Sequence, residues 1–173
     1  MIRSPGLKWA AFAGLLAGLL TISFADAAGK QEEAKKYAAQ LRTSKDVKKK
    51  VEALEELGKL GQIQKALVAD VAGDIAESLN DKDASIRKAG AEAYGRIDPD
   101  PNEAVPSLTK LLKDDKDEGV RIGAAHGLAY MRDSAKEALP ALREVAKAYK
   151  DDKKSKLGRA ASDAVRAIQP KKK

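Results

Sequence analysis

The chain has 173 residues and a formal net charge of +7, and its 43% hydrophobic and 34% charged residues fit one soluble domain with a core. It contains no cysteine and one histidine. This excludes disulfides, cysteine nucleophiles, cysteine-based zinc sites, iron–sulfur clusters and a histidine-rich metal site. The single tryptophan and both phenylalanines lie within residues 1–24, so tyrosine is the only aromatic residue in the rest of the chain.

Residues 1–27 have the pattern of a secretory signal peptide. After a basic start, residues 9–24 form a run of 16 residues without charge. Small residues follow at Ala25 and Ala27, where a signal peptidase requires them, which predicts cleavage before Ala28. The run is shorter than the ~20 apolar residues that span a membrane, so cleavage is favoured over the alternative of a retained anchor. The protein is then exported, to a bacterial periplasm or out of the cell, without a stable membrane anchor.

Residues 28–44 are predicted to form a helix that caps the domain. Its apolar residues recur at spacings of three and four, which places Ala34, Tyr37, Ala38 and Leu41 on one face. This face should cover the apolar side of the first repeat that follows, which no preceding repeat would protect from water.

The rest of the chain consists of copies of one pattern. Residues 81–97 align with residues 115–131 at an offset of 34 residues, and these align with residues 152–168 at an offset of 37 residues. A weaker copy begins at Asp46. The predicted repeats are therefore 45–81, 82–115, 116–152 and a half repeat at 153–169 within the repeat region 45–169.

Each copy divides into two helical halves. In the first half, large apolar residues such as Ile86 and Ile97 share a face with small residues such as Gly90, which would allow close helix approach. The second halves share a proline, and Pro106 and Pro140 are 34 residues apart. Because the missing N–H of proline costs nothing in the first turn of a helix, each second helix is predicted to begin just before its proline.

Such a hairpin of two antiparallel helices cannot bury its apolar face alone, but stacked copies can. The sequence therefore predicts an all-α fold. We expect a short right-handed α-solenoid of about three and a half helical-hairpin repeats with an N-terminal capping helix. Aspartates in the turns before the first-half helices are suited to cap free N–H groups. The lysine tail, residues 170–173, is expected to be disordered.

The pattern Asp-x-Asp-x-x-(Ile/Val)-Arg-x-x-(Ala/Gly)-(Ala/Gly) begins at Asp81 and again at Asp115, and Pro-x-Leu follows in the second helices. It resembles HEAT repeats and is most similar to the short bacterial HEAT-like type that is also seen in phycobilisome-lyase-related proteins. The resemblance implies that an aspartate and an arginine from neighbouring repeats form a buried ladder of hydrogen bonds. Lys50 and Gly158 depart from the pattern at its two ends. The residues assigned to the ladder and the caps are Asp81, Asp83, Arg87, Asp115, Asp117 and Arg121.

Neither the histidine nor the acidic turns predict a catalytic or metal site. His126 aligns with Glu55, Glu92 and Asp163, which are all charged, so this position is predicted to face water rather than to serve catalysis or pH sensing. The acidic turn at Asp114 resembles half of a calcium-binding loop. It lacks the bidentate glutamate at the twelfth place, so its acids are predicted to be caps and ladder residues.

Polar and basic residues on the second-half helices form the candidate binding surface. These helices are expected to line the concave side of the solenoid, where repeat proteins usually bind their partners. A basic strip there would attract an acidic protein or an anionic glycan. Nucleic acid is disfavoured because export and the absence of stacking phenylalanine or tryptophan argue against it. A solvated face without a binding role is the alternative. The strip consists of Thr109, Lys110, Lys113, Arg143 and Lys147.

These observations favour an exported, non-catalytic scaffold or adaptor that binds a protein of unknown identity through the concave face of its second helices. We expect no cofactor, and a monomer or a weak homodimer. One alternative is an accessory protein or enzyme of the HEAT-like lyase type, which rests on the resemblance alone. Another is binding to an anionic glycan or membrane surface, since basic residues are attracted to anionic lipids.

Overall fold

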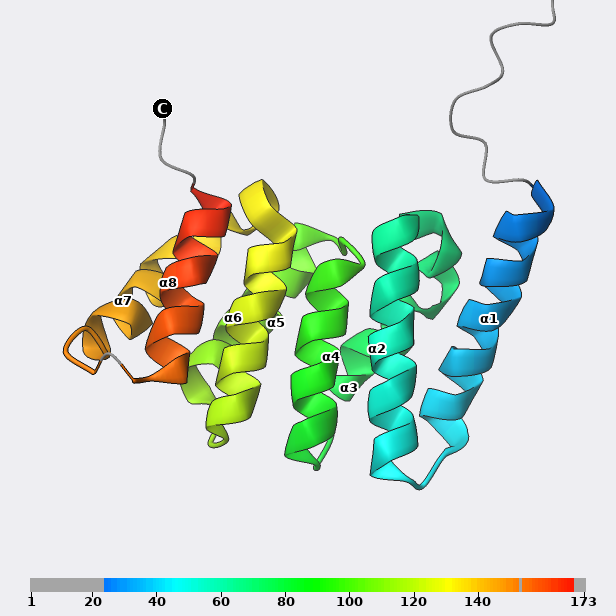
Figure 1. Ribbon diagram of the computed structural model, residues 1–173, viewed down its shortest axis with the longest axis horizontal. Coiled ribbons are helices and arrows are strands. Elements are labelled where there is room, and N and C mark those ends of the chain that lie inside the picture. The colour runs from blue at the N-terminus through cyan, green and yellow to red at the C-terminus, as the bar shows by residue number, and fades with distance from the viewer. Residues whose placement is uncertain (1–23, 153, 170–173) are drawn as a thin grey trace, which may run out of the picture.

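The computed structural model describes residues 24–152 and 154–169, which form helices and turns without any strand (Figure 1). The signal segment up to residue 23 and the lysine tail lie outside these described residues. None of the described helices is long and apolar enough to cross a membrane. The α-helices are α1 (Phe24–Thr43), α2 (Val47–Ile63), α3 (Ala72–Ser78), α4 (Ala84–Arg96), α5 (Pro101–Asp114), α6 (Glu118–Met131), α7 (Leu139–Ala148) and α8 (Lys156–Ile168), with 3₁₀ segments at Lys65–Leu67, Ala69–Val71 and Arg132–Ala138.

The helices stack into a two-layered solenoid, which confirms the predicted all-α repeat fold. Helices α2, α4, α6 and α8 pack on one another in succession and form the first layer (Figure 1). Helices α3, α5 and α7 form the second layer, each following its first-layer partner along the chain. One apolar core runs between the layers, with leucines such as Leu54, Leu108 and Leu142 fully buried. Neighbouring repeats therefore bury each other's apolar faces.

Helix α1 covers the free end of the stack. Ala34, Ala38 and Leu41 are buried against the first repeat, and Arg42 forms a bidentate ion pair with Asp74. The helix begins at Phe24, four residues before the predicted start at Ala28. The predicted cleavage residues Ala25, Ala27 and Ala28 therefore lie in its first two turns. Alanine favours helix, and Lys30 pairs with Asp26 one turn earlier, which accounts for the extension. Cleavage before Ala28 stays a prediction.

The helix starts follow from capping side chains. Asp46, Asp83 and Asp117 each accept a backbone N–H of the first turn of α2, α4 and α6, at 2.8, 2.8 and 3.0 Å. The prediction that α5 begins just before Pro106 is wrong. Asp100 caps α5 and Pro101 occupies its first turn, so Pro106 lies inside the helix. Helix α7 begins at Leu139, with its proline in the first turn as predicted.

The first layer is held together by glycine contacts between helix backbones. A Cβ atom on Gly95 of α4 would collide with the carbonyl oxygen of Gly127 in α6. A Cβ atom on Gly127 would in turn collide with the carbonyl oxygen of Ala91. The backbones of α4 and α6 therefore touch, which side chains of any size would prevent. In the second layer α5 and α7 share few contacts, and the 3₁₀ segment Arg132–Ala138 packs against both helices.

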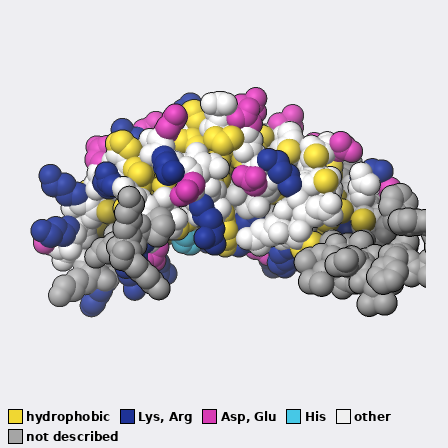
Figure 2. Space-filling view, turned by 90° about the horizontal axis from the view of Figure 1, so that it is seen from above, with side chains coloured by type: hydrophobic (Ala, Val, Ile, Leu, Met, Phe, Trp, Pro, Cys, Tyr) yellow, Lys and Arg dark blue, Asp and Glu magenta, His cyan; other side chains and the backbone are white. Residues whose placement is uncertain are grey.

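The close first layer forms the concave side of the molecule. In a curved stack the helices of the inner layer lie closer together than those of the outer layer. Figure 2 shows an arched molecule that is hollowed along its lower side, which the helices nearest the viewer in Figure 1 form. The single histidine, on the first-layer helix α6, lies on this lower side. The prediction that the second-half helices line the concave face is therefore wrong, and they form the convex face.

Gly95→Ala tests the backbone contact on which this curvature depends. The added methyl group meets backbone rather than a movable side chain, so we expect the free energy of unfolding to fall by about 2–3 kcal/mol. Gly73→Ala is the matched control, because nothing lies within 4 Å of its added Cβ atom. It should leave the stability unchanged or raise it by up to about 1 kcal/mol. Urea unfolding followed by circular dichroism measures both, and equal stability of the two variants would contradict the contact.

Candidate functional site

The predicted ladder has one complete rung, between Arg87 and Asp115. The Arg87 Nε and Nη2 atoms donate to the two carboxylate oxygens of Asp115 at 2.7 and 2.9 Å. The third nitrogen, Nη1, donates to the carbonyl oxygens of Asp81 and Lys82 at 2.9 and 3.1 Å. The side chains are only 10% and 7% exposed. Arg87 thus ties the turn before its own helix to the turn before the next repeat, with every nitrogen of its guanidinium hydrogen-bonded.

The ladder weakens toward both ends. At the N-terminal end Lys50 replaces the arginine, and its Nζ lies 3.5 Å from Asp81 Oδ2. At the C-terminal end Arg121 donates through Nε to the Leu112 carbonyl oxygen of the preceding repeat at 3.0 Å, and it does not pair with an aspartate of the following repeat. Gly158 has no side chain to continue the series. Asp83 and Asp117 cap helices instead of pairing with arginine.

The predicted basic strip lies on α5 and α7, on the convex side. Two of its four cations already have partners there. Lys113 Nζ lies 3.6 Å from Glu144 Oε2, and Arg143 Nη2 donates to Gln169 Oε1. Thr109 is half-buried, while Lys110 and Lys147 are exposed. The strip is therefore a mixed-charge surface that crosses the outer layer, and it does not face the hollow of the solenoid.

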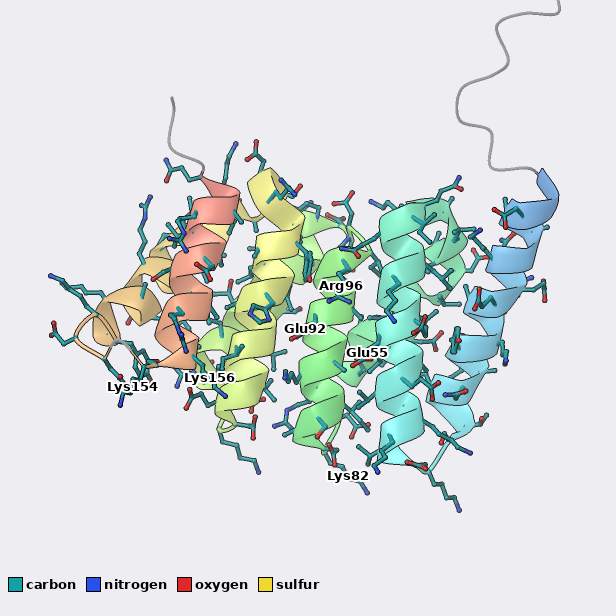
Figure 3. The ribbon with its side chains drawn as sticks, viewed as in Figure 1. Glu55, Lys82, Glu92, Arg96, Lys154 and Lys156 are labelled. Atoms are coloured by element: carbon teal, nitrogen blue, oxygen red, sulfur yellow. The ribbon has the colours of Figure 1, made fainter. Side chains whose placement is uncertain are left out.

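The concave face carries a different group of side chains, which we call the concave cluster: Glu92 and Arg96 of α4 with His126 and Tyr130 of α6. His126 Nδ1 lies 3.2 Å from Glu92 Oε1. Arg96 Nη2 donates to the Tyr130 hydroxyl at 3.0 Å, and its guanidinium carbon lies 4.7 Å from the centre of the ring. Both contacts join residues 34 positions apart, so each links the same place in consecutive repeats. Figure 3 shows Glu92, Arg96 and the neighbouring Glu55 on the face toward the viewer.

The charges of the cluster stabilise one another. Burial alone would raise the pKa of Glu92, but the hydrogen bond and charge of His126, with Lys88 and Arg96, hold this pKa below its ordinary value. Glu92 is thus an anion at neutral pH, poised beside the half-exposed imidazole. Chemically the arrangement offers a fixed carboxylate, a ring nitrogen and a guanidinium for recognition.

Arg96 and Tyr130 have groups that no other described residue contacts fully. Arg96 reaches α2, where a Cβ atom on Gly58 would lie 3.3 Å from its Cδ. Its Nε is buried without a hydrogen-bond partner among the described residues. Tyr130 is 41% exposed, one of three large hydrophobic side chains exposed in the described part of the chain. Arginine and tyrosine are, with tryptophan, the residue types that are enriched among the anchors of protein interfaces. Sequence reasoning missed this pair, although its spacing of 34 residues equals the repeat offset.

Comparison with known protein families finds a match. The family described as HEAT repeats matches residues 34–129, from the buried face of α1 to the last turn of α6. The matched segment includes the Arg87–Asp115 rung and three of the four residues of the concave cluster. A search of curated proteins found no match. Groups of three or more side chains suited to hold a metal ion are absent from residues 24–152 and 154–169.

Asp115→Asn tests the ladder and its dependence on pH. The hydrogen bonds from Arg87 hold the pKa of Asp115 below its ordinary value. Its charge therefore stabilises the fold above the ordinary aspartate pKa, and this contribution is lost as the pH falls through the lower pKa of the folded state. At pH 7 we expect Asp115→Asn to lower the free energy of unfolding by about 3 kcal/mol, because Arg87 is left without its counter-charge.

The difference between variant and wild type should shrink as the pH falls below about 4, when the wild type also loses the charge. Asp114→Asn is the matched control, since this exposed neighbour has no ion pair among the described residues. Its effect should stay within about 0.5 kcal/mol. Urea unfolding at several pH values gives these differences, and a loss in Asp115→Asn that is the same at pH 7 and pH 3 would contradict the charged rung.

Proposed function

We propose that this chain, which belongs to the HEAT-repeat family, is a non-catalytic scaffold that binds a protein partner through its concave face. That face is formed by α2, α4, α6 and α8 and not by the second-half helices. Proteins built from stacked helical repeats commonly use such concave surfaces to hold other proteins. The basic strip on α5 and α7 is accordingly assigned no part in this binding.

The observation that carries the proposal is the Arg96–Tyr130 pair at the middle of the concave face. The pair is preorganised, because the hydrogen bond and the ring contact hold the guanidinium in place before a partner arrives. The exposed ring offers apolar area, and the guanidinium has more N–H donors than its one bond to Tyr130 uses.

The backbone contacts of the first layer support the same role. The cluster sits on α4 and α6, whose backbones touch at Gly95 and Gly127 and whose register is fixed by the Arg87–Asp115 rung. Glu92 and His126 flank the Arg96–Tyr130 pair and supply a carboxylate and a ring nitrogen. We infer that the partner presents an oxygen acceptor to Arg96 and an apolar side chain to Tyr130, with polar groups around them.

The proposal includes export of the protein. It is supported by the sequence pattern of residues 1–27, and it makes the partner a protein of the periplasm or of the cell's surroundings. The alternative of an accessory protein or enzyme of the lyase type has support from resemblance alone, and a shared fold does not carry a shared chemistry. We therefore place it second.

Site-specific crosslinking tests the proposed face. We would place the photoreactive residue p-benzoylphenylalanine at position 130 on the concave face, or at position 147 on the convex face, and irradiate the protein in its native host. Position 130 should yield a discrete adduct with another protein, because the concave cluster contacts the partner. Mass spectrometry identifies that partner and the mature N-terminus. An adduct from position 147 with none from position 130 would contradict the proposal.

The identified partner then allows a quantitative test. Arg96→Ala or Tyr130→Ala should weaken binding about 30-fold, the effect typical of an interface anchor. Lys113→Ala and Arg143→Ala on the convex face should each change it less than about threefold. Isothermal titration calorimetry measures the affinities, and circular dichroism verifies that each variant is folded.

A further inference from the structure

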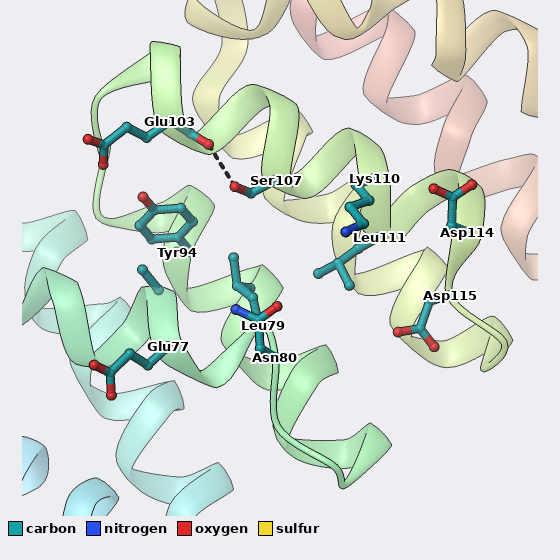
Figure 4. A pocket seen from close by; sticks show the side chains of 11 residues that line it. Glu77, Leu79, Asn80, Tyr94, Glu103, Ser107, Lys110, Leu111, Asp114 and Asp115 are labelled. Carbon is teal, nitrogen blue, oxygen red and sulfur yellow. Dashed lines mark hydrogen bonds between the residues drawn. The ribbon is translucent and has the colours of Figure 1, made fainter.

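The convex side contains a groove between α3 and α5 that the proposed function does not use. It has a volume of about 540 Å³ and runs along the facing sides of the two helices (Figure 4). It exists because the second-layer helices splay apart and because α3 has only seven residues. Between α5 and α7 the 3₁₀ segment Arg132–Ala138 packs against α5, and the Lys113–Glu144 ion pair bridges the two helices.

The floor of the groove is apolar. Leu79 follows α3, Leu111 belongs to α5, and the ring of Tyr94 comes from the first-layer helix α4 beneath them. Burial, together with Glu103 and Asp100, raises the pKa of the Tyr94 hydroxyl, so it stays protonated and can donate a hydrogen bond. The groove can thus accept an apolar side chain, with one polar group at its base.

The rim of the groove is acidic at both ends. Glu77 and Glu103 lie at one end, and Asp114 lies at the other (Figure 4). Ion-pair partners for these three carboxylates are absent among the described residues, whereas the neighbouring Asp115 is bound to Arg87. Lys110 is the one cation in the lining. On a chain with a net charge of +7, this local excess of unpaired negative charge is suited to attract cations.

We propose that the groove binds a short basic segment of a partner protein in an extended conformation. An apolar side chain of this segment fits between Leu79 and Leu111, and lysine or arginine side chains on either side of it reach Glu77 or Glu103 and Asp114. Charge complementarity selects this occupant, since the carboxylates stand at opposite ends of an apolar floor. The separation of the carboxylates fits two cationic side chains of one peptide better than a single metal ion.

This inference concerns a second surface, on the opposite face from the concave cluster, and stands independently of the proposed function. It also reverses the role of Lys110. In the predicted basic strip this lysine would attract an acidic partner. In the groove its charge opposes a basic segment, so its removal should strengthen binding. The same substitution therefore has opposite expected effects under the two interpretations.

A peptide titration tests the inference on the full chain. The probe is a fluorescein-labelled hexapeptide of alternating lysine and leucine, and its comparison is the same peptide with glutamate in place of lysine. Fluorescence anisotropy at physiological salt should show that the basic peptide binds at least about tenfold more tightly than the acidic one. Equal affinity for both peptides, or no binding of the basic peptide, would overturn the proposal.

Matched variants locate the binding. The combined variant Glu77→Gln, Glu103→Gln and Asp114→Asn should weaken binding of the basic peptide about tenfold, while Lys110→Gln should strengthen it about threefold. The control removes the same charge from exposed carboxylates elsewhere on the described surface, namely Glu33→Gln, Glu137→Gln and Asp151→Asn. An equal loss in the control would show attraction to the whole protein and would overturn the groove. Weaker binding in Lys110→Gln would overturn it as well.

A blocking variant tests the groove without changing its charge. Ser107→Trp places an indole in the groove, and Ser162→Trp on α8 is its control, because both hydroxyls donate to a carbonyl oxygen four residues earlier at 2.8 Å. Ser107→Trp should abolish measurable binding, and Ser162→Trp should leave it within about twofold. Unchanged binding in a folded Ser107→Trp protein would overturn the proposal. Arg96→Ala should leave peptide binding unchanged, so failure of the concave face can be told from failure of the groove.

Discussion

The contact between the backbones of α4 and α6 at Gly95 and Gly127 determines which face of this molecule is hollow. Two helices that touch through glycine lie closer together than two helices separated by leucine. A stack with one close layer and one wide layer must curve toward the close one. The glycines are thus costly for helix propensity and are tolerated because the packing of the layers requires them. The curvature then follows from the position of small residues in the repeat.

The curvature does not determine how far neighbouring repeats are shifted along their helix axes. The Arg87–Asp115 rung fixes this register. Helices that touch through glycine could slide along each other, but a guanidinium bound to a carboxylate and two carbonyls ties the turns of successive repeats together. In that register equivalent positions of neighbouring repeats lie side by side. Glu92 therefore meets His126, and Arg96 meets Tyr130. The cross-repeat pairs of the concave face are consequences of the same 34-residue offset that reveals the repeat in the sequence.

Local spacing and charge predict the helical repeats and the aspartate caps, whereas the aspartate–arginine ladder is implied by the resemblance to HEAT repeats. The sequence also shows the small residues of the first-half helices, such as Gly90. The prediction that the second-half helices line the concave side is nevertheless wrong, because it rests on the general behaviour of solenoids and not on those small residues. The start of α5 predicted from Pro106 is also wrong, because Asp100 and Pro101 provide a better helix start. The Arg96–Tyr130 contact depends on the register of the repeats and on the curvature of the stack. Neither can be read from single residues, so this contact was not predicted.

The convex groove depends on a feature that no repeat pattern contains. In the first repeat, residues between α2 and α3 form two short 3₁₀ segments, and only seven residues remain for α3. Its partner α5 has fourteen, so α3 leaves part of the facing surface uncovered. Curvature toward the first layer widens this gap, because it moves the outer helices apart. The tight inner layer and the open outer groove are therefore two effects of one packing asymmetry. The packing that forms the concave surface therefore also shapes the convex surface.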